Sequence, residues 1–283
     1  MIDASEGKAR QRAWAEGEDI SVDSDGYVLK VEENLFLPMS PATLMELSDG
    51  SGNELGDLGR RGKMQALHSS SALAYNVFEY WRQQEDREPL RHALGLGSSI
   101  ASIRFEGKFS TGLGGPAHVD VVLEVGDRTV GVESKFLEPF WSTTPYATFS
   151  KRYFADGIAR WTDIGLPRCQ ALAEQVYTGD LEFLRLDVPQ LLKHALGLWK
   201  LGGREASLWY LYLELAGKVG ARHRMELERF EQSAGEEIGF KALSYDQVMG
   251  RLREFGEAGH GKYLSYLENR YGGGSPSARR TPI

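Results

Sequence analysis

The stretch that decides the fold is HVDVVLEVGDRTVGVESK, residues 118 to 135. Two runs in which apolar and polar residues alternate flank the dipeptide Gly126–Asp127, and this arrangement is typical of a β-hairpin closed by a two-residue turn. With that turn, Val125 faces Arg128, and the numbers of paired residues sum to 253. The sequence therefore predicts two antiparallel strands and fixes their register.

The register assigns each side chain of the hairpin to one of two faces. Asp120 lies opposite Glu133, and Lys135 shares the face of Glu133 because side chains alternate along a strand. Gly131 falls on that charged face, where the missing side chain would leave room for a substrate. The other face is predicted to be apolar and to carry Val119, Val121, Leu123, Val125, Val130, Val132 and Phe136.

Two carboxylates on directly opposed positions have Cβ atoms roughly 4.5 to 5.5 Å apart, and like charges there destabilise a sheet unless something neutralises them. A divalent cation would do so, and hard oxygen ligands favour Mg²⁺ or Mn²⁺ over Zn²⁺. Lys135 is placed to orient an attacking water or to stabilise charge that develops on a phosphate. An ordinary surface hairpin with solvated charges would show the same residues.

Asp120 on one strand and Glu-x-Lys on the next resemble the PD-(D/E)XK nuclease superfamily, although the proline is displaced to Pro116. Four blocks, LHSSSALAYNVFEYW, VDVVL, VGVESKF and DVPQLLKHALGL, are similar in this order to a bacterial family of restriction-endonuclease-like proteins. The resemblance implies a Mg²⁺-dependent or Mn²⁺-dependent nuclease that acts on nucleic acid, in the first instance DNA. It assigns metal binding and catalysis to Asp120 and Glu133 and catalysis to Lys135.

Many members of this superfamily complete the metal site with a further acidic residue. Glu54, in GSGNEL, resembles the glycine-then-glutamate arrangement of the resolvase-like branch, and Glu106 on the preceding strand is the alternative. Glu79, beside two aromatic residues of a helical stretch, is interpreted as an exposed helix charge.

Gln190 and His194 are four residues apart and share one face of a predicted helix. The pattern resembles the glutamine-containing helix of RecB-like nucleases, with His194 where tyrosine is usual. The resemblance assigns a catalytic role to Gln190 and a supporting one to His194. His118, opposite Lys135 in the predicted register, is a second supporting candidate or a structural residue.

The formal net charge of −7 gives no overall attraction to nucleic acid, so a local basic patch is required. Phosphate contacts would position a nucleic acid without reading its sequence. Two other functions stay open: a non-catalytic nucleic-acid-binding or interaction module on the same fold, and a small-phosphoester hydrolase with an enclosed pocket. The candidate phosphate contacts are Arg60, Arg61, Lys63, Lys151 and Arg152.

Hydrophobic periodicity predicts the order of the remaining elements. This order indicates a mixed sheet with helices packed on it. The resemblance implies an α/β (α+β) fold with a restriction-endonuclease-like core, in which helices flank a mixed sheet of about five strands. We expect a flexible arm over 1–25, one nuclease-like domain with an N-terminal extension over 26–271, and a flexible tail over 272–283. Residues 27–36 are predicted to form a strand or a hairpin. The other predicted strands are 100–109, 117–125, 128–136, 208–215 and 238–243, and the predicted helices are 69–84, several within 146–200, 223–233 and 244–255.

The single cysteine, Cys169, excludes an intramolecular disulfide and a thiolate zinc site. The N-terminal residues lack the apolar core of a secretory signal, and the longest apolar stretch falls far short of the ~20 residues that span a bilayer. We expect a cytoplasmic protein without membrane contact. Whether it acts as a homodimer or with a defence-system partner stays open.

Overall fold

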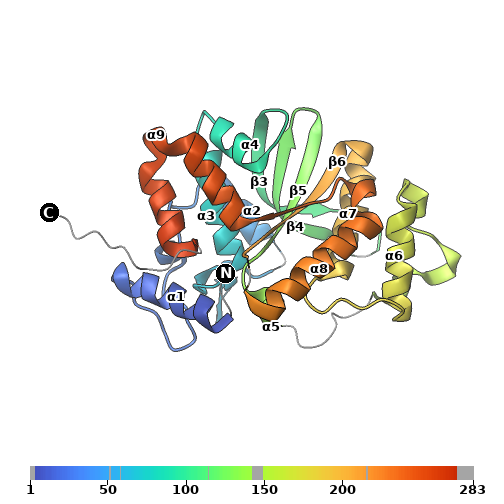
Figure 1. Cartoon of the computed structure of the whole chain (residues 1–283), viewed down its shortest axis with the longest axis horizontal. Helices are drawn as coiled ribbons and strands as arrows, with labels where there is room; N and C mark the ends of the chain where they lie inside the picture. The colour runs from blue at the N-terminus through green and yellow to red at the C-terminus, as the bar shows by residue number, and fades with distance from the viewer. Residues whose placement is uncertain are drawn as a thin grey trace.

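The computed structural model describes residues 4–50, 52–57, 59–113, 115–141, 149–214 and 216–272. A central sheet lies between two layers of helices (Figure 1). Its helices are α1 (Ala4–Gly17), α2 (Pro41–Asp49), α3 (Ser70–Arg82), α4 (Glu88–Leu94), α5 (Glu138–Trp141), α6 (Pro167–Thr178), α7 (Val188–Gly202), α8 (Gly217–Ala234) and α9 (Tyr245–Tyr271). Its strands are β1 (Gly56–Asp57), β2 (Arg60–Arg61), β3 (Ile100–Phe109), β4 (Ala117–Val125), β5 (Arg128–Lys135), β6 (Ala206–Tyr212) and β7 (Lys241–Ser244). Single-turn 3-10 helices lie at η1 (Val31–Asn34), η2 (Lys63–Gln65), η3 (Lys151–Tyr153), η4 (Ala155–Gly157), η5 (Thr162–Ile164), η6 (Gly203–Glu205) and η7 (Gly235–Ile238).

The five long strands form one mixed sheet in the order β3-β4-β5-β6-β7. The first three strands are an antiparallel meander, whereas β6 runs parallel to β5 and β7 runs parallel to β6. The parallel crossover from β5 to β6 contains α6 and α7, as a parallel connection requires. The structure therefore confirms the predicted α+β fold with a five-stranded mixed sheet.

The hairpin of β4 and β5 has the predicted register. Paired residues run from Val125 with Arg128 to Val121 with Val132, so their numbers sum to 253 throughout. Gly126 adopts a φ of +57°, a conformation that glycine reaches without steric cost.

Both faces of this sheet are covered by helices. One apolar core lies between the sheet and α3, α4 and α9, and the other lies between the sheet and α6, α7 and α8 (Figure 1). The face that carries the charges is covered by α7, so the alternative of an ordinary surface hairpin with solvated charges does not hold. Periodicity along one hairpin cannot reveal a helix that packs on it from far along the chain.

The predicted apolar face is confirmed for all its members except Val119, which joins the core under α7. Val119 and Val122 lie in the same core although they are three residues apart, so strict alternation fails near Asp120. Opposite this point on β3, Glu106 has a φ of +49°, a conformation that bulky residues rarely adopt. The irregularity coincides with the predicted site residues.

Side chains cap the starts of α3 and α7. The Ser69 hydroxyl accepts a hydrogen bond from the backbone N–H of Ala72 at the start of α3, and the Asp187 carboxylate accepts one from the N–H of Gln190 at the start of α7. Each cap satisfies an N–H group that the first helical turn leaves unpaired. The caps therefore fix where both helices begin.

The N-terminal region differs most from the predictions. Residues expected to form a flexible arm contain α1, which packs against α9 through hydrogen bonds between the side chain of Gln11 and both the side chain and the carbonyl of Arg270. The strand or hairpin predicted over 27–36 is replaced by η1 and isolated bridges such as Tyr27 with Ala66. The predicted tail, apart from Gly272, lies outside the described residues.

Helix α9 extends well beyond the helix predicted over 244–255. It begins as expected, with a capping box between Ser244 and Gln247. Gly259 has a φ of +89°, which a regular α-helix does not contain. Figure 1 shows that α9 changes direction along its length. The glycines of this segment lower its predicted helix propensity, and tertiary packing overrides them. Among the described helices, none has the length and apolar character needed to cross a membrane.

Candidate active site

Lys135, near the end of β5, is held between two partners. Its Nζ atom donates to Oε1 of Glu133 at 2.5 Å and to Oε1 of Gln190 on α7 at 3.0 Å. Burial alone would lower the pKa of Lys135, but the carboxylates of Glu133 and Asp120 outweigh it and raise the pKa above its usual value. The side chain therefore remains an ammonium at neutral pH.

Glu133 is buried beside that ammonium, with only 1% of its surface exposed. Burial would raise the pKa of Glu133, yet the charges of Lys135 and then His194 lower it to about 2. Nε2 of His194 lies 2.9 Å from Oε2 of Glu133, but the orientation is not that of a hydrogen bond, and neither atom has another hydrogen-bond partner among the described residues. Oε2 of Glu133 therefore lies against the imidazole of His194, while Oε1 accepts from Lys135.

Asp120 reaches β5 from β4 through its side chain. Its Oδ2 atom accepts the backbone N–H of Ser134 at 2.7 Å, just beyond the last ladder pair, Val121 with Val132. Burial, and then the neighbouring charge of Glu133, raises the pKa of Asp120 well above its usual value. The pairing of Asp120 with Glu133 lies one position past the ladder and stays a prediction, but their carboxylates interact electrostatically.

Helix α7 can bring Gln190 and His194 to β5 because its contact with the sheet is close. A Cβ atom added at Gly197 would lie 2.8 Å from the Cβ of Phe109, and one added at Gly131 would lie 2.7 Å from Cδ1 of Leu198. Larger residues at either position would push the helix away. Gly131 was expected to leave room for substrate; instead the Leu198 side chain fills that space, so the expectation was wrong.

Glu54 and Glu106, proposed as alternatives, both lie near this centre. Burial, and then the carboxylates of Glu54 and Glu133, raises the pKa of Glu106 to about 7. Oε2 of Glu54 is buried without a hydrogen bond, and Oε1 lies 3.4 Å from Nζ of Lys63. We call Glu54, Glu106, Asp120 and Glu133 the acidic cluster.

Two glycines let the chain pass close to these carboxylates. A Cβ atom at Gly52 would lie 2.3 Å from Oε1 of Glu54, and one at Gly50 would lie 3.0 Å from Oε2 of Glu106. The glycines near Glu54 in the sequence therefore have a steric role, because a Cβ atom at either position would crowd a carboxylate.

The other predicted residues are distributed unevenly. Nδ1 of His118 lies 3.8 Å from Oε2 of Glu106, so it borders the acidic cluster. Arg61 pairs with Asp23 and Asp25, and Arg60 is exposed on β2. Lys151 and Arg152 are exposed on η3, and among the described residues neither contacts the acidic cluster. Of the five basic candidates, Lys63 alone contacts a described member of the cluster.

Three residues that support the site were not predicted. Ser134 donates its backbone N–H to Asp120, and its hydroxyl lies 2.6 Å from the hydroxyl of Tyr245 on α9. Glu138 accepts the backbone N–H of Phe136 and adds to the negative charge around Lys135. Glu138 follows Lys135 closely in the sequence and could have been considered, whereas nothing in the sequence links Tyr245 to β5. Glu79, interpreted as exposed, is buried against Thr43 and Gln83.

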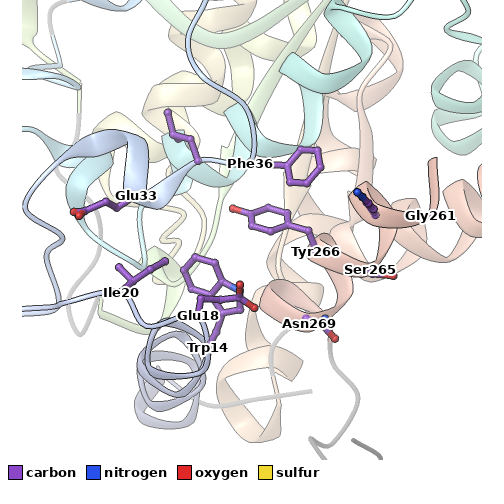
Figure 2. A pocket seen from close by; sticks show the side chains of 11 residues that line it. Trp14, Glu18, Ile20, Glu33, Phe36, Gly261, Ser265, Tyr266 and Asn269 are labelled. Atoms are coloured by element: carbon purple, nitrogen blue, oxygen red, sulfur yellow. The ribbon is translucent and has the colours of Figure 1, made fainter. Parts of the chain in front are cut away.

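A pocket of about 660 Å³ lies elsewhere, between α1, η1 and α9 (Figure 2). Trp14, Phe36 and Tyr266 supply aromatic walls, and Glu18 and Glu33 supply carboxylates. None of the predicted site residues lines it. The acidic cluster and this pocket are therefore separate features.

The acidic cluster does not form a preassembled metal site: among the described residues, no three side chains of His, Cys, Asp or Glu are placed to hold a metal ion. A search of curated proteins and one of solved structures each gave no match to this chain. The family described as REase-ARP, Restriction Endonuclease associating with ARP, matches residues 5–272, and the chain therefore belongs to this restriction endonuclease family.

Proposed function

We propose that the protein is a Mg²⁺-dependent or Mn²⁺-dependent nuclease of the PD-(D/E)XK type that hydrolyses phosphodiester bonds, in the first instance in DNA. The observation that carries the proposal is the Lys135 ammonium, fixed between Glu133 and Gln190 beside three further carboxylates. Membership of a restriction endonuclease family supports the same activity.

The donor atoms present, all carboxylate oxygens, are the kind that a hard divalent cation takes, although the described side chains are not preassembled around one. Oε2 of Glu54 is buried without a hydrogen bond, and burial, followed by the charge of neighbouring carboxylates, raises the pKa values of Glu106 and Asp120. Such an excess of negative charge is what a cation relieves. In our assignment Asp120, Glu133 and Glu54 hold the metal, and Glu106 is a fourth acidic neighbour.

The metal would neutralise the charge of the scissile phosphate and polarise its oxygens. Lys135 keeps its proton and directs the attacking water or stabilises the negative charge that develops on phosphorus-bound oxygen. Water forms the new P–O bond and gives up a proton to solvent as the bond to the leaving oxygen breaks, and the leaving oxygen takes up a proton from solvent. Gln190 positions Lys135. His194 faces Oε2 of Glu133, and His118 orients Glu106.

Burial of Glu133 leaves a small-phosphoester hydrolase as a second candidate, because an enclosed carboxylate suits a small substrate. The presence of Lys63 beside Glu54 favours the nuclease, because it supplies a cation that can contact a phosphate backbone.

Incubation with supercoiled and linear DNA, with RNA, and with a small phosphodiester tests both activities in Mg²⁺, Mn²⁺ or EDTA. We expect cleavage of DNA that EDTA abolishes and that Lys135→Ala eliminates. Lys218→Ala, which removes an exposed lysine of α8, is the control. Hydrolysis of the small substrate without cleavage of either nucleic acid would establish the second candidate instead.

Calorimetric titration with Mn²⁺ separates the roles within the site. Asp120→Asn and Glu133→Gln are expected to lose most of the binding heat, whereas Lys135→Ala retains more of it. Glu228→Gln, at an exposed position of α8, is the control for removal of a carboxylate. Equal loss in the Lys135 and carboxylate variants would contradict the assignment.

A further inference from the structure

Three aromatic rings from distant parts of the chain form a continuous strip on the surface. The ring of His68 packs edge to face against Trp141 at 5.4 Å and against Tyr27 at 6.5 Å between centroids. Trp141 is 45% exposed, which is unusual for so large an apolar residue. We call Tyr27, His68 and Trp141 the ring strip, and the proposed nuclease mechanism uses none of them.

Three cations surround the ring strip. Nζ of Lys8 lies 5.1 Å from the Trp141 ring centre, and the guanidinium of Arg61 lies 5.2 Å from that of Tyr27. Arg12 donates to the carbonyls of Asp23 and Ser24.

Two of these cations have no compensating acid. In the described ranges, neither Lys8 nor Arg12 forms an ion pair with a carboxylate, whereas Arg61 pairs with Asp23 and Asp25. Burial, and then the charges of Lys8 and Arg12, lowers the pKa of His68 to about 4, so this ring is neutral at pH 7. Lys8, Arg12 and Arg61 therefore exceed the paired carboxylates of Asp23 and Asp25 by one charge around these neutral rings.

Two segments of the chain and one hydrogen bond connect the ring strip and its cations to the acidic cluster and Lys135. Arg61 precedes Lys63, which contacts Glu54, by two residues. Trp141 follows Lys135 by six residues along β5 and α5. Ser70, two residues after His68, accepts a hydrogen bond from the hydroxyl of Ser134, whose N–H binds Asp120.

We propose that the ring strip binds an unpaired segment of a nucleic-acid strand next to the acidic cluster. The exposed ring of Trp141 can stack on a base that has left a duplex, and Lys8 beside it can contact a neighbouring phosphate. Lys8, on its long flexible stem, moves from the Trp141 ring to a phosphate when a base takes its place. The inference deepens the proposed function, because it rests on the strand being the substrate of the acidic cluster.

The test measures fluorescence anisotropy of a labelled 12-nucleotide single strand and of the matching duplex, with the full chain in EDTA so that cleavage does not intervene. Trp141→Ala should weaken single-strand binding about tenfold, in line with the loss of one stacked base. Trp141→Phe should restore most of it. Phe255→Ala, which removes another exposed aromatic residue, should have no effect.

Lys8→Ala should weaken single-strand binding and lower the slope of log affinity against log salt by about 0.7, the value for one phosphate contact with a single strand. Lys218→Ala should leave the slope unchanged. Unaltered single-strand binding by Trp141→Ala would overturn the proposal, and so would equal losses for single strand and duplex. Equally tight binding of a free mononucleotide would also overturn it, because a strand would then not be required.

Failure of this inference can be told apart from failure of the nuclease proposal. Lys135→Ala should bind the single strand as well as the unaltered protein does, yet cleave nothing. If the unaltered protein cleaves no nucleic acid in Mg²⁺ or Mn²⁺ but loses single-strand binding with Trp141→Ala, the nuclease proposal fails and the ring strip stands. If cleavage is normal and Trp141→Ala binds normally, the ring strip fails alone.

Discussion

Nζ of Lys135 on β5 and Oε1 of Gln190 on α7 lie 3.0 Å apart, which joins a strand to a helix 55 residues away. Lys135 therefore donates to two acceptors, the neutral amide of Gln190 and the charged carboxylate of Glu133. A lysine held in this way has little freedom to leave the acidic cluster, so the amide acts by positioning.

Gln190→Ala should lower kcat for DNA cleavage by at least about tenfold while KM changes little, because the mispositioned ammonium affects the reaction more than binding. The thermal unfolding midpoint should change by only a few degrees. Gln175→Ala, at an exposed position of α6, provides the matched control. If Gln190→Ala raised KM and left kcat unchanged, Gln190 would bind substrate and would not position Lys135.

Glu133→Ala should destabilise the fold as well as abolish cleavage. The substitution leaves a largely buried ammonium without its closest carboxylate, and breaking a buried pair costs about 3 kcal/mol. On an ordinary surface hairpin with solvated charges, the same change would scarcely alter stability. The free energy of unfolding of the metal-free protein, measured in urea, distinguishes a buried Glu133 from a solvated one.

The control for Glu133→Ala is Glu236→Ala, which breaks an exposed pair with Arg168 and should cost less than about 1 kcal/mol. Equal, small effects of both substitutions would show that Glu133 is solvated in solution.

The hairpin could be predicted because its information is local. Gly126–Asp127 sets the turn, and alternation sets the faces, so the register of β4 and β5 followed from a single stretch. The cover over Glu133 could not be predicted in this way, because it depends on α7 and on the close approach at Gly197. Likewise, the sequence offered Glu54 and Glu106 as alternatives for the further acidic residue of the metal site. Folding brings both of them near Glu133.

Gly197→Ala tests whether the close approach of α7 is needed. The added methyl group would lie 2.8 Å from the Cβ of Phe109 and 3.0 Å from that of Ala117, so the helix must shift. We expect a loss of about 1 to 3 kcal/mol in the free energy of unfolding, measured in urea, together with reduced cleavage as Gln190 and His194 move away from β5.

Gly250→Ala is the control, because no atom lies within 4 Å of the added Cβ at this exposed site in α9. It should stabilise the protein by about 0.5 to 1 kcal/mol, since alanine favours a helix more than glycine does. A stability loss at Gly250 similar to that at Gly197 would remove the packing explanation.

His223 on α8 should make stability depend on pH. Its ring is 1% exposed, and Nε2 lies 3.1 Å from the hydroxyl of Tyr210 on β6. Burial, and then the charges of Arg224 and Arg185, lowers the pKa of His223 to about 4. A histidine in the unfolded chain has a pKa of about 6.5. Between these values the unfolded chain binds a proton that the folded chain does not, so stability falls as pH falls through this window.

The free energy of unfolding should therefore drop by up to about 3 kcal/mol between pH 7 and pH 4 through this residue, since each pKa unit corresponds to about 1.36 kcal/mol. His223→Gln cannot take up the proton, and its free energy of unfolding in urea should fall less over the same range. His92→Gln, which removes a more exposed ring, should leave the pH dependence as it is in the unaltered protein. If His223→Gln and the unaltered protein lost stability in parallel, the ring would not be held neutral by its burial against β6.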